Sequence, residues 1–317
     1  AGFKPINTNT SVWGEGESAP TISNIKAGLV IEDKDGNQFV WVPVDGNQVK
    51  YQKHEYATSI FDDTSASTAD TGNGNWKTQD YRNYNDWQDE GGNTSSVTRY
   101  GGFYIARYEA GIPENASFYG NTQGSQYITT RDVTTYIPVS KEKQPVWNFI
   151  SQANAKTVAE KMYNTLSVKS SLIDSYAWDT VTTWIASNEH DVTNSTTWGN
   201  YLNSAFSING LYAIHTFSDV WNYAPTYNKG TYSIETGNRI ETATGASERN
   251  KAKNIYDLAG NVSEWTTETG KHGTVDTIYA VTRGGSIEKE GENSPISFKR
   301  FLLTLNPLSS ISPSTNA

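Results

Sequence analysis

The 317-residue chain contains no cysteine, and this absence excludes several kinds of site at once. Without a thiol the chain has no disulfide, no thiolate zinc site, no iron–sulfur cluster and no cysteine nucleophile. Long apolar runs are also missing, since none approaches the roughly 18–20 residues that a membrane-spanning helix requires. We therefore expect no membrane insertion.

Charged residues are scarce as well, at 19% of the chain, and acidic residues outnumber basic ones to give a net charge of −9. Nucleic-acid surfaces need clustered Lys and Arg, so we expect no nucleic-acid partner. The chain is instead rich in aromatic residues, with 10 Phe, 10 Trp and 19 Tyr. Few charges and many aromatic residues argue against disorder and indicate a chain that buries a large core.

The N-terminal half favours strands and loops. Residues 1–25 are polar and contain two prolines, which predicts an extended arm. A β-hairpin is predicted for residues 28–44, because two apolar runs flank an Asp-Gly-containing turn at 33–37. Residues 57–100 are rich in Asn, Asp, Gly, Ser and Thr, which predicts a long loop, and a strand is expected at 102–111.

Helical periodicity appears only in the middle of the chain. Ser151 is a plausible N-cap for a helix over 152–164, and apolar residues at helical spacing predict a second helix over about 172–186. No linker and no internal repeat is visible. The pattern predicts one α+β domain over residues 26–317, with short strands, two main helices and long polar loops.

Three segments are more specific together than any one alone: Phe39–Val44, Asn254–Trp265 and the Arg-Gly-Gly-Ser sequence at 283–286. In this order they resemble the formylglycine-generating enzyme (sulfatase-modifying factor) family, a variant of the C-type lectin fold. The resemblance covers roughly residues 25–310. It implies an α+β C-type lectin fold of the formylglycine-generating-enzyme type.

The resemblance does not carry over the family's chemistry. The family's oxidase binds copper through a pair of cysteines, which this chain lacks, and iron-dependent relatives use a histidine cluster. The histidines here stand at scattered positions: His54, His190, His215 and His272. We therefore expect neither copper nor iron and no enzymatic activity. Calcium-dependent sugar binding is also disfavoured, because Pro113-Glu114-Asn115 has the wrong order for the usual tripeptide.

A structural calcium ion is implied by the family resemblance at residues 257–264. Carried over by position, the ligands would be the side chains of Asp257 and Glu264 and the backbone carbonyls of Gly260 and Val262. Calcium prefers such oxygen ligands. The alternative is that both carboxylates accept hydrogen bonds from backbone amides and hold the loop without metal.

The composition changes after Ser286. Of the 22 residues at 287–308, eight are large and apolar and six are charged, whereas none is Tyr or Trp. In relatives this stretch is dominated by Tyr, Asn, Ser and Gly. The pattern resembles that of the target proteins of diversity-generating retroelements. These proteins use this fold, and the retroelement mutates adenines in the gene segment that encodes their C-terminal part. The predicted ligand-binding residues are Ile287, Glu288, Lys289, Glu290, Glu292, Ser294, Ile296, Phe298, Lys299, Arg300, Phe301, Leu302, Leu303 and Leu305.

The resemblance thus predicts a non-catalytic ligand-binding protein that displays a diversified C-terminal surface to a protein or cell-surface ligand. Such a protein would lie outside the cell, on a bacterial surface or a phage particle. The alternative is a structural or adhesive module without a diversified site, in which the apolar residues from 298 to 305 form the core of the last strands. The solvent exposure of residues 287–308 discriminates between the two.

Overall fold

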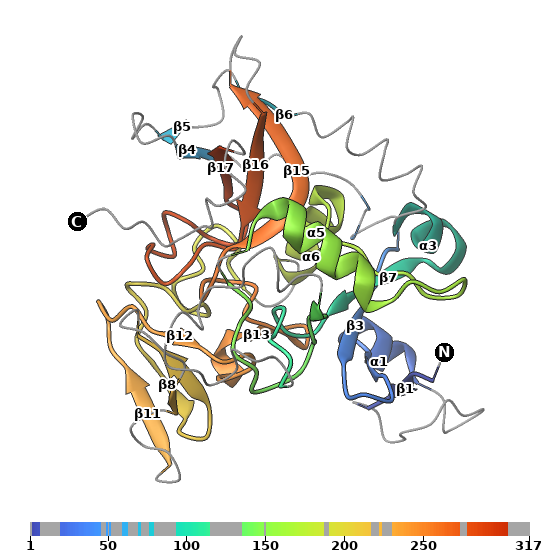
Figure 1. Cartoon of the computed structure of the whole chain (residues 1–317), viewed down its shortest axis with the longest axis horizontal. Helices are drawn as coiled ribbons and strands as arrows, with labels where there is room; N and C mark the ends of the chain where they lie inside the picture. The colour runs from blue at the N-terminus through green and yellow to red at the C-terminus, as the bar shows by residue number, and fades with distance from the viewer. Residues whose placement is uncertain are drawn as a thin grey trace.

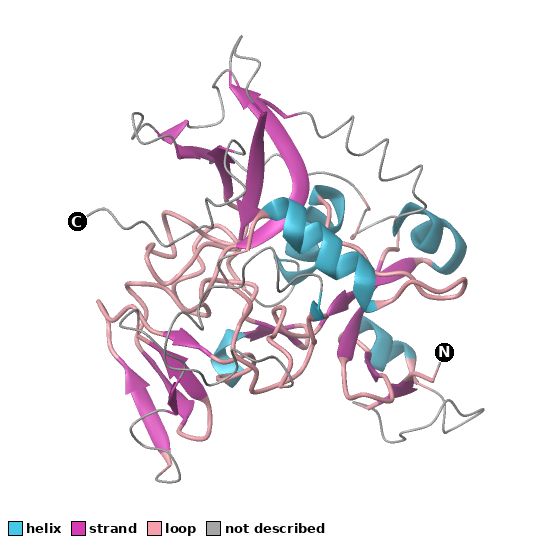
Figure 2. Ribbon diagram, viewed as in Figure 1, coloured by secondary structure: helices cyan, strands magenta, loops and turns pink. Residues whose placement is uncertain are grey.

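The computed structural model describes residues 2–6, 20–45, 49, 51, 59–62, 69–70, 76–78, 93–114, 135–148, 150–186, 190–216, 222–223, 230–272 and 278–303. Within these ranges the chain is a mixed α+β protein with few helices and several small, mainly antiparallel sheets (Figure 2). This confirms the predicted α+β class. No helix in this part of the chain combines the length and apolar character needed to cross a bilayer.

The predicted hairpin over residues 28–44 is confirmed. Its strands belong to a four-stranded sheet made of β1 (Lys4–Pro5), β2 (Val30–Glu32), β3 (Gln38–Pro43) and β7 (Gly102–Ala106). The turn is fixed by Asp33, whose Oδ1 accepts hydrogen bonds from the amides of Asp35 (2.9 Å) and Asn37 (2.8 Å). Val40 and Val42 alternate into the core, as a strand with one buried face requires.

Two expectations about the N-terminal half are wrong in part. The arm is not extended throughout, because Ile22–Lys26 forms helix α1. A reciprocal capping box between Thr21 and Asn24 caps the N-terminus of this helix. The predicted loop over 57–100 contains β4 (Ser59–Asp62), β5 (Ala69–Asp70), β6 (Trp76–Thr78) and helix α3 (Asn93–Tyr100). Tertiary contacts hold α3, since Val97 packs on the core and Ser96 Oγ donates to the Gly102 carbonyl at 2.7 Å.

Both predicted helices are present with slightly different ends. Helix α5 (Gln152–Met162) begins after Ser151, whose Oγ accepts from the Asn154 amide at 3.3 Å. Helix α6 (Ser175–Ala186) begins later than predicted, because Asp174 takes the capping role and accepts from the Ala177 amide at 2.8 Å. The buried face of α6 carries Trp178 and Trp184 into the largest apolar cluster.

The Ser151 cap offers a direct stability test. We expect Ser151→Ala to lower the free energy of unfolding by about 1 kcal/mol, because the Asn154 amide would lose its side-chain acceptor. Urea denaturation measures this difference. Lys156→Ala, at an exposed position of the same helix, serves as the control and should change stability by less than about 0.5 kcal/mol. A loss as small as the control's would mean that the cap is not formed.

The largest sheet has six strands in the order β5-β4-β17-β16-β15-β6 and lies at the top of Figure 1. Its centre is formed by β15 (Glu264–His272), β16 (Ile278–Arg283) and β17 (Lys299–Leu303). β17 pairs with β4 in parallel, whereas the other neighbours are antiparallel. Helix α5 packs against β15 through Ala155 and Trp265, and the Trp265 ring nitrogen donates to the Ile150 carbonyl at 2.6 Å.

The remaining strands form three small antiparallel sheets in the lower part of Figure 1. They are β9 (Ala213–His215) with β10 (Asn222–Tyr223) and β12 (Glu241–Thr242), β8 (Phe206–Asn209) with β11 (Thr231–Ile234), and β13 (Lys251–Ala252) with β14 (Ile255–Tyr256). A short 3-10 helix, η2 (Glu248–Asn250), precedes β13. A second apolar cluster, which includes Ile208, Ile214 and Ile234, fills the space between β8, β9 and β11.

Candidate functional site

The segment after β14 folds into a tight loop around buried carboxylates. Asp257, Gly260 and Asn261 all have positive φ angles of 59°, 76° and 60°. At Gly260 a Cβ atom would lie 2.1 Å from the Asn200 carbonyl oxygen, so only glycine fits there. The loop is therefore closed tightly against residue 200, and its carboxylates Asp257 and Glu264 lie near a third one, Glu109, from the segment after β7.

Two of these three carboxylates are held by hydrogen bonds. Asp257 is fully buried and accepts from the Gly245 amide at 2.8 Å and from the Asn250 side chain at 3.4 Å. Burial raises the pKa of Asp257 to about 7. Glu109 accepts from the Asn261 side chain at 2.6 Å and from the Val262 amide at 3.4 Å. For Asp257 the structure therefore agrees with the hydrogen-bond alternative.

Glu264 is different. It is the first residue of β15, and both of its carboxylate oxygens are inaccessible to solvent. Neither oxygen receives a hydrogen bond from another of the described residues. Burial, and then the neighbouring charges of Glu109 and Asp257, raise the pKa of Glu264 well above its usual value. A buried carboxylate without donors is stabilised either by a proton or by a cation.

The space beside Glu264 is shaped by Gly284. A Cβ atom at this glycine would lie 2.1 Å from Glu264 Oε2 and 3.0 Å from the Leu258 carbonyl oxygen. A carboxylate and a backbone carbonyl thus face the same small space, which suits a hard cation. No three His, Asp or Glu side chains among the described residues converge as a metal-binding group. The oxygen atoms of Glu264 and of the Leu258 carbonyl are of the kind that calcium binds, and the carbonyls of Gly260 and Val262 stay predicted ligands.

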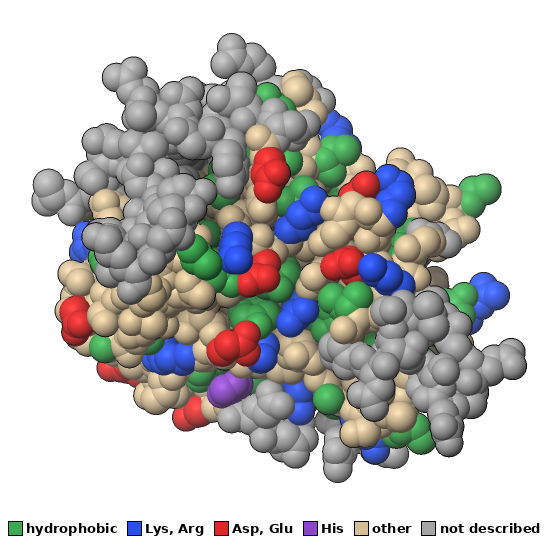
Figure 3. Space-filling model, turned by 90° about the horizontal axis from the view of Figure 1, so that it is seen from below, with side chains coloured by type: hydrophobic (Ala, Val, Ile, Leu, Met, Phe, Trp, Pro, Cys, Tyr) green, Lys and Arg blue, Asp and Glu red, His purple; other side chains and the backbone are tan. Residues whose placement is uncertain are grey.

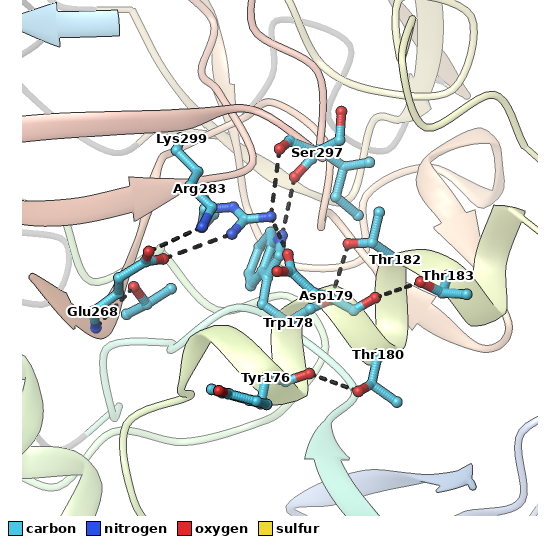
Figure 4. A network of polar contacts seen from close by, with 12 residues as sticks. Tyr176, Trp178, Asp179, Thr180, Thr182, Thr183, Glu268, Arg283, Ser297 and Lys299 are labelled. Carbon is cyan, nitrogen blue, oxygen red and sulfur yellow. Dashed lines mark hydrogen bonds and ion pairs between the residues drawn. The ribbon is translucent and has the colours of Figure 1, made fainter. Parts of the chain in front are cut away.

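The Arg-Gly-Gly-Ser sequence begins with a buried arginine at the end of β16. Arg283 Nη2 lies 2.5 Å from Asp179 Oδ1 of α6, and both side chains are completely shielded from solvent. Nη1 faces Glu268 of β15 at 3.9 Å, and Nη2 also donates to the Ser297 carbonyl at 3.4 Å. Figure 4 shows the guanidinium between the two carboxylates, beside the Trp178 ring. One side chain thus joins α6, β15 and the segment before β17.

Lys299 completes this network, and its predicted place on a ligand-binding surface is wrong. Its side chain is 9% exposed, and its ammonium group lies 2.9 Å from Glu268 Oε1 (Figure 4). The network therefore contains two cations and two carboxylates, and its formal charges balance. Because all four are buried, Lys299 is a structural residue of β17.

The predicted ligand-binding residues divide by burial. Ile287, Ser294, Ile296, Phe298 and Lys299 are buried, Glu288, Lys289, Arg300 and Leu302 are partly buried, and Glu290 and Glu292 are exposed. The side chains of Phe301 and Leu303 and all of Leu305 lie outside the described residues. The expectation that apolar residues of this segment face outward is wrong for Ile287, Ile296 and Phe298. The charged residues between 288 and 292 are exposed or partly buried.

These charged residues belong to a turn that we call the display loop, residues 288–293. Backbone bonds fix it to an earlier segment, because the Ser195 amide donates to the Gly291 carbonyl (3.0 Å) and the Leu202 amide to the Lys289 carbonyl (2.9 Å). The carboxylate of Glu292 accepts from Thr196 Oγ (2.9 Å) and the Asn203 amide group (2.7 Å). Sequence reasoning did not identify the 191–203 segment as this support, since no motif pairs it with a segment about 90 residues later.

Two histidines lie within the described part of the chain with their side chains defined. His215 is buried and bonded to Glu241 at 2.8 Å, and His190 stacks on Trp198 with ring centroids 4.6 Å apart. They belong to different surroundings and form no shared ligand set. Among the described residues, the histidines therefore offer no paired iron ligands.

Comparisons with protein-family models, curated proteins and solved structures find no match to this chain.

Proposed function

We propose that this chain is a non-catalytic ligand-binding protein on a C-type-lectin scaffold of the formylglycine-generating-enzyme type, with the display loop as part of its contact surface. The observation that carries the proposal is the alternation of anchors and exposed residues around this loop. Ile287 on one side and Ile296 and Phe298 on the other are buried, whereas Glu290 and Glu292 between them face solvent.

This arrangement suits a segment whose side chains vary. The backbone of the display loop is held by bonds to residues 195 and 202 that involve none of its side chains. Gly291 permits the close approach, because a Cβ atom there would lie 2.4 Å from the Thr196 amide nitrogen. Binding residues are commonly placed on loops that a rigid scaffold positions. Diversification would then act on the exposed and partly buried positions of 288–293 and spare Gly291 and the buried anchors.

The partner in this proposal is a protein or another cell-surface molecule, and the chain acts outside the cell, on a bacterial surface or a phage particle. On the face shown in Figure 3, basic and acidic side chains alternate around apolar ones. No nucleic-acid partner is part of the proposal, because such a surface needs clustered Lys and Arg. A structural calcium ion near Glu264 is part of the same proposal.

The proposal predicts that the charged side chains of the display loop can be replaced without unfolding the protein. We expect simultaneous replacement of Glu288, Lys289, Glu290 and Glu292 by alanine to reduce binding at least tenfold. The measurement is binding of labelled protein to a panel of intact bacterial cells, with calorimetry to show a melting temperature within a few degrees of the wild type. The matched control replaces Lys156 and Glu160, exposed charges of α5, by alanine.

Undiminished binding by the fourfold variant would contradict the assignment of the loop. It would favour the second candidate, a structural or adhesive surface module, which the burial of Ile287, Ile296 and Phe298 also fits. Sequencing the gene from several isolates is an independent test. Diversification predicts substitutions concentrated at codons 288–293, together with a nearby reverse transcriptase, whereas a uniform spread of substitutions contradicts it.

A further inference from the structure

Tyr201 is a fully buried residue next to the Glu264 site, by which we mean the carboxylate of Glu264 and the neighbouring Leu258 carbonyl. Its hydroxyl donates to the Gly284 carbonyl at 2.7 Å. Burial raises the pKa of this hydroxyl, and the carboxylate of Glu264 raises it further. The hydroxyl therefore stays protonated as a donor, and it lies within electrostatic range of Glu264.

Gly284 is the link between Tyr201 and Glu264. A Cβ atom at Gly284 would lie 2.1 Å from Glu264 Oε2, so the carboxylate rests against the backbone of this residue. The carbonyl of Gly284 accepts from Tyr201 and also from the Gly260 amide, at 2.8 Å. A movement of the Glu264 carboxylate toward a cation therefore acts on a residue whose carbonyl Tyr201 holds.

The ring of Tyr201 has no room to move independently of its surroundings. A Cβ atom would lie 2.3 Å from the ring at Gly199 and 2.7 Å from it at Gly285, so both backbones touch the ring. The same Cβ atom at Gly285 would lie 2.2 Å from the carbonyl oxygen of Ser294, the residue that follows the display loop. Because interiors packed in this way have few voids, they transmit small displacements.

The two residues that follow Tyr201 hold the display loop. The Leu202 amide donates to the Lys289 carbonyl at 2.9 Å. The side-chain oxygen of Asn203 accepts from the Gly291 amide at 3.1 Å. This short stretch thus connects the surroundings of the buried carboxylate with the middle of the loop.

We propose that Tyr201 is a positioning residue, which couples a calcium ion bound at the Glu264 site to the conformation of the display loop. The inference rests on the calcium site and the display loop of the proposed function, and it adds how the first acts on the second. A carboxylate fixed by a cation fixes Gly284, and the hydrogen bond from Tyr201 passes this order to the segment that holds the loop. Chains of packed side chains and hydrogen bonds carry energetic coupling between sites.

Amide hydrogen exchange of the wild-type chain tests the coupling without a ligand for the loop. We expect calcium to slow exchange at Leu202 and Gly291 about tenfold relative to chelator, because both amides are exposed when the loop opens. The reference is the Leu211 amide, which Asn209 Oδ1 holds at 2.9 Å in a turn at the end of β8. Exchange at this amide also reports local opening, and it should change by less than about twofold.

Tyr201→Phe removes the hydroxyl and keeps the ring. We expect this variant to retain the rise in melting temperature with calcium, whereas the calcium effect on exchange at Leu202 and Gly291 should fall below about twofold. A hydroxyl with a merely structural role would instead change stability equally with and without calcium. Tyr212→Phe is the matched control and should keep the full effect, because it removes a hydroxyl that is bonded to Glu142, away from the loop.

Equal exchange at Leu202 and Gly291 with calcium and with chelator would overturn the proposal, and so would an undiminished calcium effect in Tyr201→Phe. The wild-type measurement decides the matter even if the variant does not fold. A melting temperature that calcium leaves unchanged would contradict the calcium site and the coupling together. A melting shift with unchanged exchange in the loop would contradict the coupling alone, so the two failures are distinguishable.

Discussion

Replacement of Arg283 by methionine is expected to lower the free energy of unfolding by about 3–5 kcal/mol, a large effect for a single substitution. The substitution removes the cation that contacts both Asp179 and Glu268, and both carboxylates are fully shielded from solvent. Removing one partner of a buried ion pair costs more than the pair contributes, because the remaining charge stays desolvated. Arg283 also joins α6 to the central strands, so the loss affects several elements together.

Guanidinium chloride denaturation measures this loss, and two variants sharpen its interpretation. Lys156→Met removes a cation from the exposed side of α5 and should cost less than about 0.5 kcal/mol. Adding Asp179→Leu to Arg283→Met should restore part of the lost stability, because it removes a buried carboxylate that has lost its arginine. A loss below about 1 kcal/mol for Arg283→Met would show that the network does not exist in this form.

The sequence predicted those helices and strands whose own residues show a clear pattern. The hairpin follows from the alternation of Val40 and Val42 with more exposed neighbours and from the turn at Asp33. The helices follow from apolar spacing and from the Ser151 cap. Helix α1 and the two-residue strands were not predicted, because five residues or fewer contain too little periodicity. Their formation depends on capping and on contacts with distant segments.

The surface was harder to predict than the elements. The predicted ligand-binding residues after Ser286 were chosen from the change in composition and from the resemblance to diversified segments. Between Ile287 and Leu303, where the structure describes this segment, Lys299–Leu303 is a strand, whereas Ile287 and Ile296 belong to loops and turns that pass into the core. The composition change marks a distinctive segment but does not reveal which side chains are exposed. Lys299 shows the same difficulty, because its partner Glu268 is 31 residues earlier and across the sheet.

Part of the metal assignment could be refined only with side-chain positions. The family resemblance, carried over by position in the sequence, gave Asp257 and Glu264 the same role as calcium ligands. The structure separates them, because Asp257 accepts two hydrogen bonds whereas neither oxygen of Glu264 receives one from another described residue. Hydrogen bonds from Gly245 and Asn250 come from a segment that no motif connects to the loop. The distinction leads to a prediction about calcium that treats the two residues differently.

Calcium is expected to stabilise chelator-treated protein by about 2.7 kcal/mol when its concentration is a hundredfold above the dissociation constant. The reason is the buried carboxylate of Glu264, which receives no hydrogen bond from another described residue. Calcium would give this carboxylate a counter-ion. Differential scanning calorimetry with and without calcium, at the same pH and ionic strength, measures the shift. Magnesium is a useful comparison, because it demands a smaller octahedral site and should stabilise less.

Glu264→Gln and Asp257→Asn should respond in different ways. The first variant should be more stable than wild type in chelator, because it replaces a carboxyl group whose pKa burial raises, and it should lose the response to calcium. Asp257→Asn should change the stability in chelator little, because the Asn oxygen can still accept from the Gly245 amide, and it should keep a calcium response. If wild-type protein shows no shift with calcium, the loop is held without metal, and Glu264 is then stabilised as a neutral acid.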